Sequence, residues 1–461
     1  MSILGAFILP HPPILLPEVG RGEERHIQAT ADAYREVSRR IAALAPETVV
    51  ILSPHAVMYA DYFHISPGKR ARGDLKRFGA DGVTVEAEYD TAFVETLAGE
   101  AHAEGIHAGT LGERDKTLDH GTFIPLRFLQ QAGVDAKLVR IGLSGFSPLM
   151  HYRLGKCIAK AAQTLGRRTV VVASGDLSHK LKEDGPYGFA PEGPAFDREM
   201  TAAISVGDFS KFLTVSPEDA EAAAECGLRS CIVLSGALDQ KAVQPELLSY
   251  EGPFGVGYAV GAFAITGEDT TRQFDTQYEA TRRERISLAR AGEDAYVRLA
   301  RYSLETYVRS GKRAALPQGL PEELTSKRAG VFVSLKLDGR LRGCIGTTEP
   351  TAPSIAQEIL HNAVSAGAED PRFDPVTAEE LEHIVYSVDV LGEAEPVLDE
   401  SELDPKQYGV IVSAGRRRGL LLPDLAGVDT AAEQVEIARK KAGIREGEQV
   451  SLQRFLVVRH K

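Results

Sequence analysis

Three histidines follow closely after apolar stretches of the chain. The stretches and their histidines are Ile3–Leu9 with His11, Val49–Leu52 with His55, and Val170–Ala173 with His179. Near-continuous apolar strands are typical of buried parallel sheets, and such sheets bind ligands where the chain leaves the carboxyl ends of the strands. Imidazole binds metal ions and transfers protons near neutral pH. We therefore expect these histidines to meet in one metal or acid–base site.

Three further residues are candidates for the same site. His120 lies in a segment that we expect to be a loop before an apolar helix over 123–131. Glu225 and Cys226 precede a second apolar helix, expected over 228–238. A carboxylate ligand suits Fe(II), whereas a thiolate is softer and also suits zinc or copper. The residue types alone leave both Glu225 and Cys226 open as a third ligand beside two imidazoles.

Residues 1–265 alternate apolar strands with helical patterns. Besides the first stretch, the expected elements are strands Thr48–Leu52, Ala136–Leu143 and Thr169–Ala173, and helices Glu23–Leu44, Thr91–Glu104, Pro148–Leu165 and Phe196–Ser205. The apolar, glycine-rich stretch Gly255–Ile265 predicts a last strand. This alternation predicts an α/β fold, either a sandwich or a doubly wound sheet, with a central and largely parallel sheet.

The length of the chain, 461 residues, is too great for one ordinary core and indicates two or three domains. Residues 266–284 begin with the polar and acidic stretch TGEDTTRQFDTQ, which predicts a linker. A charged helix is expected from about Tyr278, and 285–461 shows the pattern of an α+β domain. Within it, the expected strand Val331–Leu337 meets Asp338-Gly339, a good signal for a hairpin turn.

The composition argues against a general nucleic-acid-binding protein. The net charge is -12, whereas such proteins carry a basic face, and we interpret Arg416-Arg417-Arg418 as a solvated hairpin turn. No apolar run approaches the ~20 residues that span a bilayer, and the N-terminus lacks the basic start and cleavage site of a signal peptide. Four cysteines without a CxxC pair favour free thiols and a cytoplasmic protein.

Five motifs along residues 1–265 resemble those of the class III extradiol ring-cleavage dioxygenases and of their relatives, the Memo proteins. The motifs are LPHPP at 9–13, SPHA at 53–56, DHGTFIPL at 119–126, SGDLSH at 174–179 and AECGLRS at 224–230. As an ordered set they are far more specific than any single one. The resemblance implies an α/β sandwich with His11 and His55 as metal ligands. It further implies that His179 is the acid–base histidine and that His120 orients the substrate.

The third ligand that the resemblance implies differs between the two groups of relatives. The dioxygenases use a glutamate from this region, which Glu225 would supply. Memo-like proteins place a cysteine there, followed by glycine, and the Cys226-Gly227 pair matches that pattern. We therefore expect Cys226 to be the ligand, with Glu225 as the alternative. The SGDLSH and DHG motifs, by contrast, keep the dioxygenase form.

The second domain resembles the AMMECR-type domain. The shared strings are LRGCIGT at 341–347, Asn362-Ala363, EDPRF at 369–373 and GLLLP at 419–423. Its candidate site comprises Arg342, Gly343, Cys344, Asp370 and Arg372. Cys344 would be a nucleophile if a base such as His361 lay beside it, and is otherwise a small buried residue. Asp370 and Arg372 are expected to form an ion-paired turn.

These resemblances imply a non-haem Fe(II)-dependent extradiol dioxygenase that acts on a catecholic or related aromatic small molecule. The alternative is a Memo-like metal-binding protein that holds iron or copper and cleaves no ring. A weaker alternative is a zinc hydrolase in which His179 activates water. Such fusions resemble bacterial and archaeal AmmeMemoRadiSam systems, which implies a radical S-adenosylmethionine protein as a partner. We expect no nucleic-acid or membrane partner, and a homo-oligomer stays open.

Overall fold

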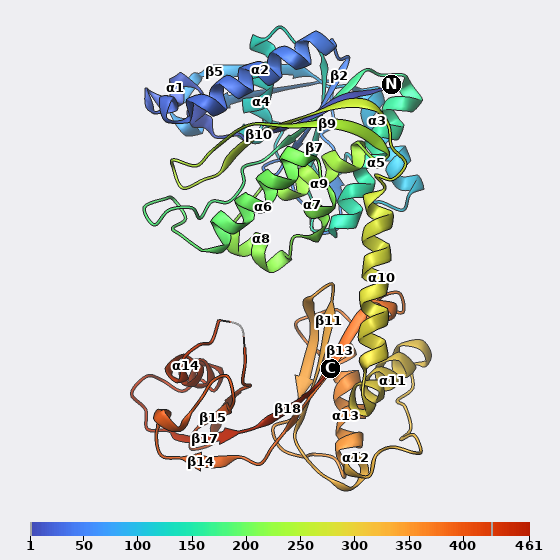
Figure 1. Ribbon diagram of the computed structural model, residues 1–461, viewed down its shortest axis with the longest axis vertical. Helices are drawn as coiled ribbons and strands as arrows, with labels where there is room; N and C mark the ends of the chain where they lie inside the picture. Colours follow the sequence, from blue (N-terminus) through green and yellow to red (C-terminus); the bar gives the residue numbers. More distant parts are fainter. Residues whose placement is uncertain (1, 426) are drawn as a thin grey trace. The chain divides into compact units, whose positions relative to one another are not determined.

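The computed structural model describes residues 2–425 and 427–461 (Figure 1). Residues 1 and 426 of the two expected domain ranges therefore lie outside the described residues. The chain divides into two compact units, Met1–Ala280 and Thr281–Lys461. Each unit is described below by itself.

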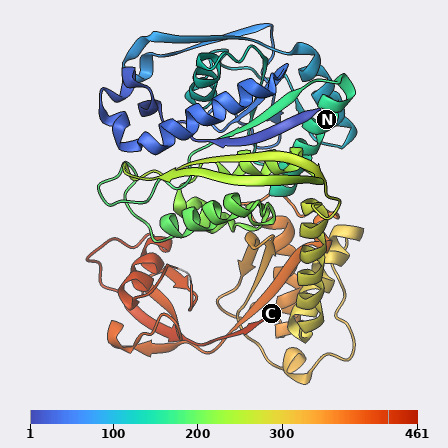
Figure 2. The same ribbon diagram turned by 45° about the horizontal axis from the view of Figure 1, so that its top comes forward.

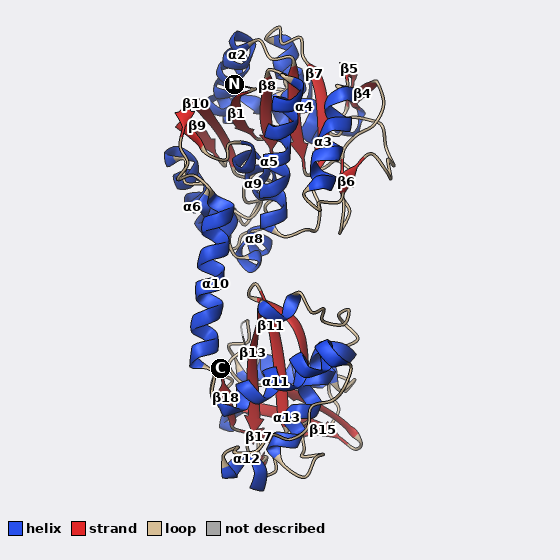
Figure 3. Ribbon diagram, turned by 90° about the vertical axis from the view of Figure 1, so that its right-hand side faces the viewer, coloured by secondary structure: helices blue, strands red, loops and turns tan. Residues whose placement is uncertain are grey.

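The first unit is built on a six-stranded sheet in the order β7-β2-β8-β1-β10-β9. The strands are β7 (Lys137–Gly142), β2 (Thr48–Ser53), β8 (Thr169–Ser174), β1 (Ile3–Leu9), β10 (Tyr258–Glu268) and β9 (Lys241–Glu251). The first four strands in this order pair in parallel, and β10 and β9 add an antiparallel edge. The strands of this sheet are drawn in red in Figure 3. The prediction of an α/β fold with a largely parallel central sheet is confirmed.

Helices cover both faces of this sheet and build a separate core on each (Figure 2). On one face lie α3 (Thr91–Ala103), α5 (Pro148–Leu165), α6 (Glu192–Val206), α7 (Ser210–Thr214) and α9 (Leu228–Ala237). On the other lie α2 (Gln28–Leu44), α4 (His120–Gln131) and the hairpin of β4 (Arg70–Leu75) and β5 (Ala80–Glu88). Alternate side chains of β2 point to opposite faces of the sheet. Val50 and Leu52 pack in one core, and Val49 and Ile51 pack in the other.

Short elements complete the first unit. They are α1 (Pro17–Gly20), α8 (Pro217–Ala223), the paired strands β3 (Phe63–His64) and β6 (Ala108–Gly109), and 3-10 turns at Pro13–Leu15, Glu23–Ile27 and Lys76–Phe78. The helix expected over 23–44 therefore begins with a 3-10 turn, and its α-helical part starts at Gln28.

The segment 266–284, expected to be a linker, is not an irregular connection. Strand β10 continues to Glu268, and helix α10 (Phe274–Gly292) begins only six residues later. Phe274 is buried in a core of the first unit, and Lys156 Nζ lies 2.8 Å from the carboxylate of Asp275. The polar composition of this segment thus reflects an exposed strand end, a turn and a helix start.

The second unit is an α+β domain with two four-stranded sheets, in the orders β12-β11-β13-β18 and β14-β17-β15-β16. The strands are β11 (Val331–Leu337), β12 (Arg340–Gly346), β13 (Ile384–Leu391), β14 (Glu395–Val397), β15 (Gly409–Ala414), β16 (Arg417–Leu421), β17 (Ser451–Phe455) and β18 (Val457–His460). The helices after α10 are α11 (Ala295–Ser310), α12 (Glu322–Ser326), α13 (Ile355–Val364) and α14 (Ala431–Lys441). A π-helical turn, Ser365–Glu369, follows α13, and 3-10 turns lie at Glu380–Glu382 and Glu400–Glu402.

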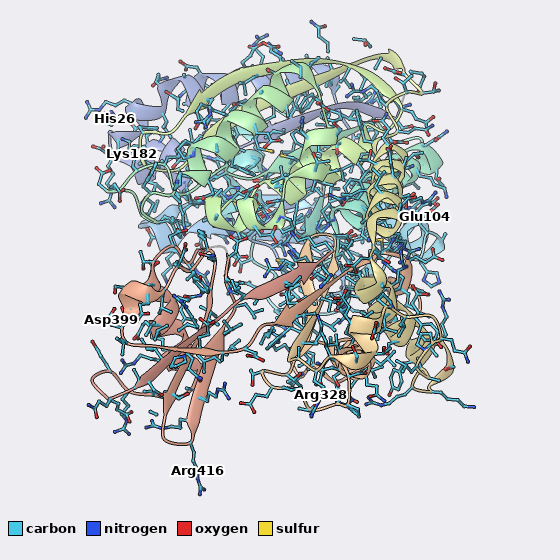
Figure 4. The ribbon with its side chains drawn as sticks, turned by 60° about the horizontal axis from the view of Figure 1, so that its bottom comes forward. His26, Glu104, Lys182, Arg328, Asp399 and Arg416 are labelled. Carbon is cyan, nitrogen blue, oxygen red and sulfur yellow. The ribbon has the colours of Figure 1, made fainter. Side chains whose placement is uncertain are left out.

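Two turns in the second unit agree with their sequence-based expectations. Asp338 and Gly339 both have positive φ, 53° and 84°, and join β11 to β12 as a tight hairpin. Arg416 stands at the turn between β15 and β16 and extends outward from it (Figure 4). Among the residues that the structure describes, no helix has the length and apolar character needed to cross a lipid bilayer.

Candidate metal centre

The sheet topology explains why three histidines that are distant in sequence lie together. Strand β8 lies between β2 and β1, and all three run in parallel. Their carboxyl ends therefore share one edge of the sheet. His11 and His55 follow β1 and β2 by two residues each, and His179 follows β8 by five. The parallel order thus delivers these side chains to one edge.

Three of the candidate ligands form a compact group. The Nε2 atoms of His11 and His55 lie 2.9 Å apart, and Cys226 Sγ lies 3.8 Å from His11 Nε2. Within the described part of the chain, one ligand atom from each of these residues lies within 4.8 Å of the others. Metal–nitrogen bonds of about 2.0–2.1 Å and metal–sulfur bonds of about 2.3 Å would place one ion between such atoms. The donor set therefore fits a single divalent metal ion.

Ser174 sets the orientation of the His11 ring. Its hydroxyl donates to the carbonyl oxygen of Gly121 at 2.6 Å, so it acts as an acceptor toward His11 Nδ1, which lies 2.9 Å away. The Nδ1 of His11 therefore carries the hydrogen, and its Nε2 presents a lone pair toward His55 and Cys226. A partner of this kind on the second ring nitrogen is typical of histidines that bind metals.

Burial controls the charge of this group. It lowers the pKa of His11, and the nearby His55 lowers it further, so that His11 is neutral at physiological pH. Burial likewise lowers the pKa of His55 and raises that of the Cys226 thiol. Burial also raises the pKa of Asp176 to about 6. Neutral imidazoles are ready ligands, and a bound cation would favour the thiolate form of Cys226.

Cys226 reaches the histidines because two loops meet backbone to backbone. A Cβ added at Gly175 would lie 2.1 Å from the Cα of Gly227, so this contact leaves no room for a side chain at Gly175. Gly227 has an ordinary φ of -94°, and a Cβ there would lie 3.0 Å from the Asp176 carbonyl oxygen, which is a tight contact. The contact brings Cys226 beside Asp176, whose backbone N–H donates to Cys226 Sγ at 3.3 Å.

Glu225, the alternative third ligand, has a different partner. Its Oε2 accepts a hydrogen bond from the backbone N–H of Leu228 at 2.6 Å, at the start of α9. Glu225 does not belong to the group of close ligand atoms found among the described residues. The geometry therefore favours Cys226 over Glu225.

His120 lies in the first turn of a helix rather than in the preceding loop. It is the first residue of α4, whose N-cap, Asp119, accepts from the backbone N–H of Thr122. The His120 ring stacks on that of His55 with centroids 4.1 Å apart and lies 5.2 Å from that of His11. Burial, together with these two neighbouring histidines, lowers the pKa of His120 to about 3. His120 is therefore a neutral hydrogen-bonding group beside the ligands.

A cavity of about 630 Å³ opens beside His55 and His120. This volume lies within the range that holds a small organic ligand. Its wall includes Phe78, whose ring centroid lies 5.3 Å from that of His120. Arg140, only 1% exposed, also lines the cavity and donates to the Thr117 carbonyl oxygen at 2.7 Å, which holds the loop before His120.

His179 lies near the ligands without being one of them. A positive charge on His179 would lower the pKa of both His11 and Asp176, so His179 is close enough to interact with them. Its backbone N–H donates to the carbonyl oxygen of Ala223, whereas its Nδ1 is buried without a hydrogen-bond partner in the described structure. The structure thus places His120 and the three histidines that follow strands in one region.

Two residues of this centre were missed in the sequence analysis. Asp176 accepts from the backbone N–H of His11 at 2.8 Å and contacts Cys226 through its own backbone, and Ser174 orients His11. Both lie in the SGDLSH motif, from which the sequence analysis predicted a role for His179 alone. The signal available in the sequence was the polar run directly after a buried strand.

The candidate residues of the second domain also lie together. Cys344 donates its backbone N–H to Asp370 Oδ2 and accepts at its carbonyl oxygen from Arg372, each at 2.9 Å. Arg372 and Asp370 form an ion pair at 2.7 Å. Arg342 Nε donates to Glu380 at 2.7 Å. Gly343 packs closely, since a Cβ there would lie 2.0 Å from the Ala366 carbonyl oxygen.

The thiol of Cys344 is paired with a serine and not with the expected base. Ser334 Oγ donates to Cys344 Sγ at 3.2 Å. His361 is exposed, and its Nδ1 accepts from Arg313 at 2.8 Å. These contacts favour a structural role for Cys344 over a nucleophilic one.

Comparisons with known proteins match two parts of the chain to two different families. The family described as the catalytic LigB subunit of aromatic ring-opening dioxygenase matches residues 5–261, and the AMMECR1 family matches residues 297–460. Protein CA_C1420 of Clostridium acetobutylicum is 41% identical over 469 residues and covers 100% of both chains. A protein of Thermotoga maritima is 56% identical over 172 residues, which are 37% of this chain and 99% of its own.

A solved structure, uncharacterized protein PH0010 from Pyrococcus horikoshii, has 32% sequence identity with a TM-score of 0.34. It covers 36% of this chain and 89% of its own. The family matches and the full-length relative give the identity of the chain. It belongs to the LigB family of aromatic ring-opening dioxygenases through its N-terminal domain, which is fused to a C-terminal AMMECR1 domain.

Proposed function

We propose that the N-terminal domain is a non-haem Fe(II)-dependent, extradiol dioxygenase-like enzyme that acts on a catecholic or related aromatic small molecule. One observation carries the proposal: the His11, His55 and Cys226 ligand atoms lie together, with further histidines and a ligand-sized cavity beside them. Two imidazoles and one anionic ligand leave other coordination positions free for substrate and dioxygen.

The chain's own residues would bind, orient and move protons. Iron, when bound, supplies the chelation of the two substrate oxygens and the activation of dioxygen. His179 is the proposed general base for the second phenolic proton, since its Nδ1 has no protein partner among the described residues. His120, kept neutral by its surroundings, is the proposed hydrogen-bond partner of the bound substrate. Phe78 would place an apolar ring in the wall of the cavity.

A second candidate function rests on Cys226. A thiolate is a soft ligand that also suits copper, and it would make this a metal-binding or redox protein without ring cleavage. In this candidate the same three residues hold iron or copper. A zinc ion at this site would instead suit hydrolysis by activated water. The neighbouring His120 and His179 favour the dioxygenase, because holding a metal requires neither.

The proposal also covers the cellular location and the partners of the protein. The four cysteines are all free thiols, which suits the cytoplasm. We propose a radical S-adenosylmethionine protein as a partner of the fused chain, with the AMMECR1 domain in an accessory role. The proposed substrate is a small molecule, with no nucleic-acid or membrane partner.

The test is metal content and oxygen consumption after anaerobic purification. Wild-type protein, Cys226→Ala and Glu225→Ala would be compared on a panel of catechols. About one iron per chain, lost in Cys226→Ala and kept in Glu225→Ala, with oxygen uptake by wild type on a catechol, would support the dioxygenase. Stable metal without uptake on any catechol would support the second candidate. Folded protein that binds no metal would overturn both.

A further inference from the structure

The chain after His179 forms a small hairpin that returns to the same region. The backbone of Leu181 bridges that of Phe189, and the backbone N–H of Ala190 donates to the Lys180 carbonyl oxygen at 3.2 Å. Residues 180–190 are therefore a defined structure and not an open loop. Lys182, on this hairpin, is labelled in Figure 4.

The hairpin is fastened to the loop between β9 and β10. Leu181 N–H donates to the Gly255 carbonyl oxygen at 3.1 Å, and Lys182 Nζ donates to the Pro253 carbonyl oxygen at 2.7 Å. Gly255 has a φ of 83°, and a Cβ there would lie 2.9 Å from the Cα of Gly185. The two loops thus meet glycine against glycine, which holds the hairpin in place.

This hairpin lays the ring of Tyr187 against His179. The ring centroids are 5.2 Å apart with an interplanar angle of 86°, an edge-to-face contact. Tyr187 nevertheless remains 61% exposed. Its ring therefore contacts the imidazole on one side and offers a large aromatic surface on the other.

The His179 ring needs such a contact. Its Nδ1 is buried and has no hydrogen-bond partner among the residues that the structure describes. His11 differs, because Ser174 orients it through Nδ1. With no hydrogen bond at Nδ1, packing against neighbouring side chains must hold the His179 ring.

We propose that Tyr187 is a positioning residue of the N-terminal domain. Its ring packs edge to face on the His179 imidazole and fixes the orientation of that ring, and its exposed surface receives the ring of an aromatic substrate. The second part rests on the proposed function, and the first does not. Aromatic rings favour edge-to-face and offset contacts, which suits both roles.

The positioning role is tested without metal or substrate. Diethyl pyrocarbonate acylates unprotonated imidazoles, and mass spectrometry gives the rate at each histidine. We expect Tyr187→Ala to raise the rate at His179 severalfold and Tyr187→Phe to keep the wild-type rate. His102, which is exposed on α3, is the internal control in each sample.

Phe189→Ala is the matched control variant. Phe189 is a second exposed aromatic residue of the same hairpin, 46% exposed, so its loss tests a general loosening of the segment. An unchanged rate at His179 in Tyr187→Ala would overturn the positioning role. An equal rise in Phe189→Ala and Tyr187→Ala would also overturn it.

The substrate surface is tested with 4-nitrocatechol and the iron-loaded chain. We expect Tyr187→Ala to weaken its binding roughly 2–10-fold, the range that one aromatic pair supports, and Tyr187→Phe to bind as wild type does. Equal binding by Tyr187→Ala and wild type would overturn this part. If wild type binds no catechol, the proposed function fails, and the acylation rates still decide the positioning role.

Discussion

The metal centre of the first domain and the Cys344 cluster of the second domain each place a cysteine beside an aspartate, but their polar groups are paired to different extents. Around Cys344, the backbone N–H, the carbonyl oxygen and the thiol each have a protein partner. At the metal centre, the Nε2 atoms of His11 and His55 face each other, and His179 Nδ1 has no partner in the described residues.

This difference distinguishes a structural cluster from a binding site. The structural cluster, formed by Cys344, Asp370 and Arg372, is called the brace below. Buried polar groups are normally paired, so convergent groups left without full partners point to a missing ligand. Asp370 accepts hydrogen bonds from Arg372 and from the backbone N–H of Cys344 in β12, and these bonds stabilise the fold. The histidines of the metal centre are not all paired in this way, which supports their role as a ligand site.

The largest expected effect breaks the metal centre itself. His55→Ala removes one of three proposed ligands, so metal affinity should fall by more than the roughly 10–100-fold that loss of an outer partner costs. Calorimetric titration of the apoprotein with Fe(II) under anaerobic conditions would measure it. His26→Ala, which alters an exposed histidine, is the control. Equal affinity in the two variants would refute the proposed centre.

The second prediction breaks the brace. Asp370→Ala should destabilise the second domain by about 2 kcal/mol, because it leaves the partly buried N–H of Cys344 without its acceptor and removes the ion-pair partner of Arg372. Hydrogen exchange of β11 and β12 in the full chain would show this loss. Metal affinity should stay at the wild-type value. A drop in metal affinity without a loss of protection would contradict the structural role.

The brace also predicts a pH dependence. The Arg372 side chain and the backbone N–H of Cys344 hold the pKa of Asp370 well below its usual value. Its contribution to stability is therefore complete above the unfolded value of about 3.9 and is lost as the pH falls below it. Wild type should lose second-domain stability below about pH 4 more steeply than Asp370→Ala. Parallel curves in urea denaturation would argue against this assignment.

The smallest predicted effect concerns Ser174, which orients the ligand His11 through a hydrogen bond. Ser174→Ala leaves His11 Nδ1–H without its acceptor, so metal affinity should fall by roughly 10-fold. Ser235→Ala is the matched control, because that buried hydroxyl donates to the Ile232 carbonyl oxygen inside α9. Metal titration of both variants decides the point, and equal losses would exclude a specific role for Ser174.

The sequence predicted the parts of the fold that local patterns encode. Strand β1 and helix α5 have the predicted bounds, because apolar runs and capping signals mark them directly. Strand β9 was not predicted. It is a mostly half-buried edge strand that contains Pro245 and lacks both a continuous apolar run and a strict alternation.

The same distinction holds for the site. Placement after buried parallel strands predicted that His11, His55 and His179 would meet, because topology alone brings such ends together. The choice between Glu225 and Cys226 could not be made from residue types. It depends on the backbone contact of Gly175 with Gly227, which is a tertiary feature that no local pattern encodes.

The most direct test of the central claim is the absorption spectrum of the Co(II)-substituted chain. Cobalt bound by a thiolate shows sulfur-to-metal charge-transfer absorption in the near ultraviolet, so the spectrum reports the ligand itself. We expect this absorption in wild type and in Cys344→Ser, and its loss in Cys226→Ser. Absorption that persists in Cys226→Ser, or that disappears in Cys344→Ser, would contradict a metal centre built from His11, His55 and Cys226.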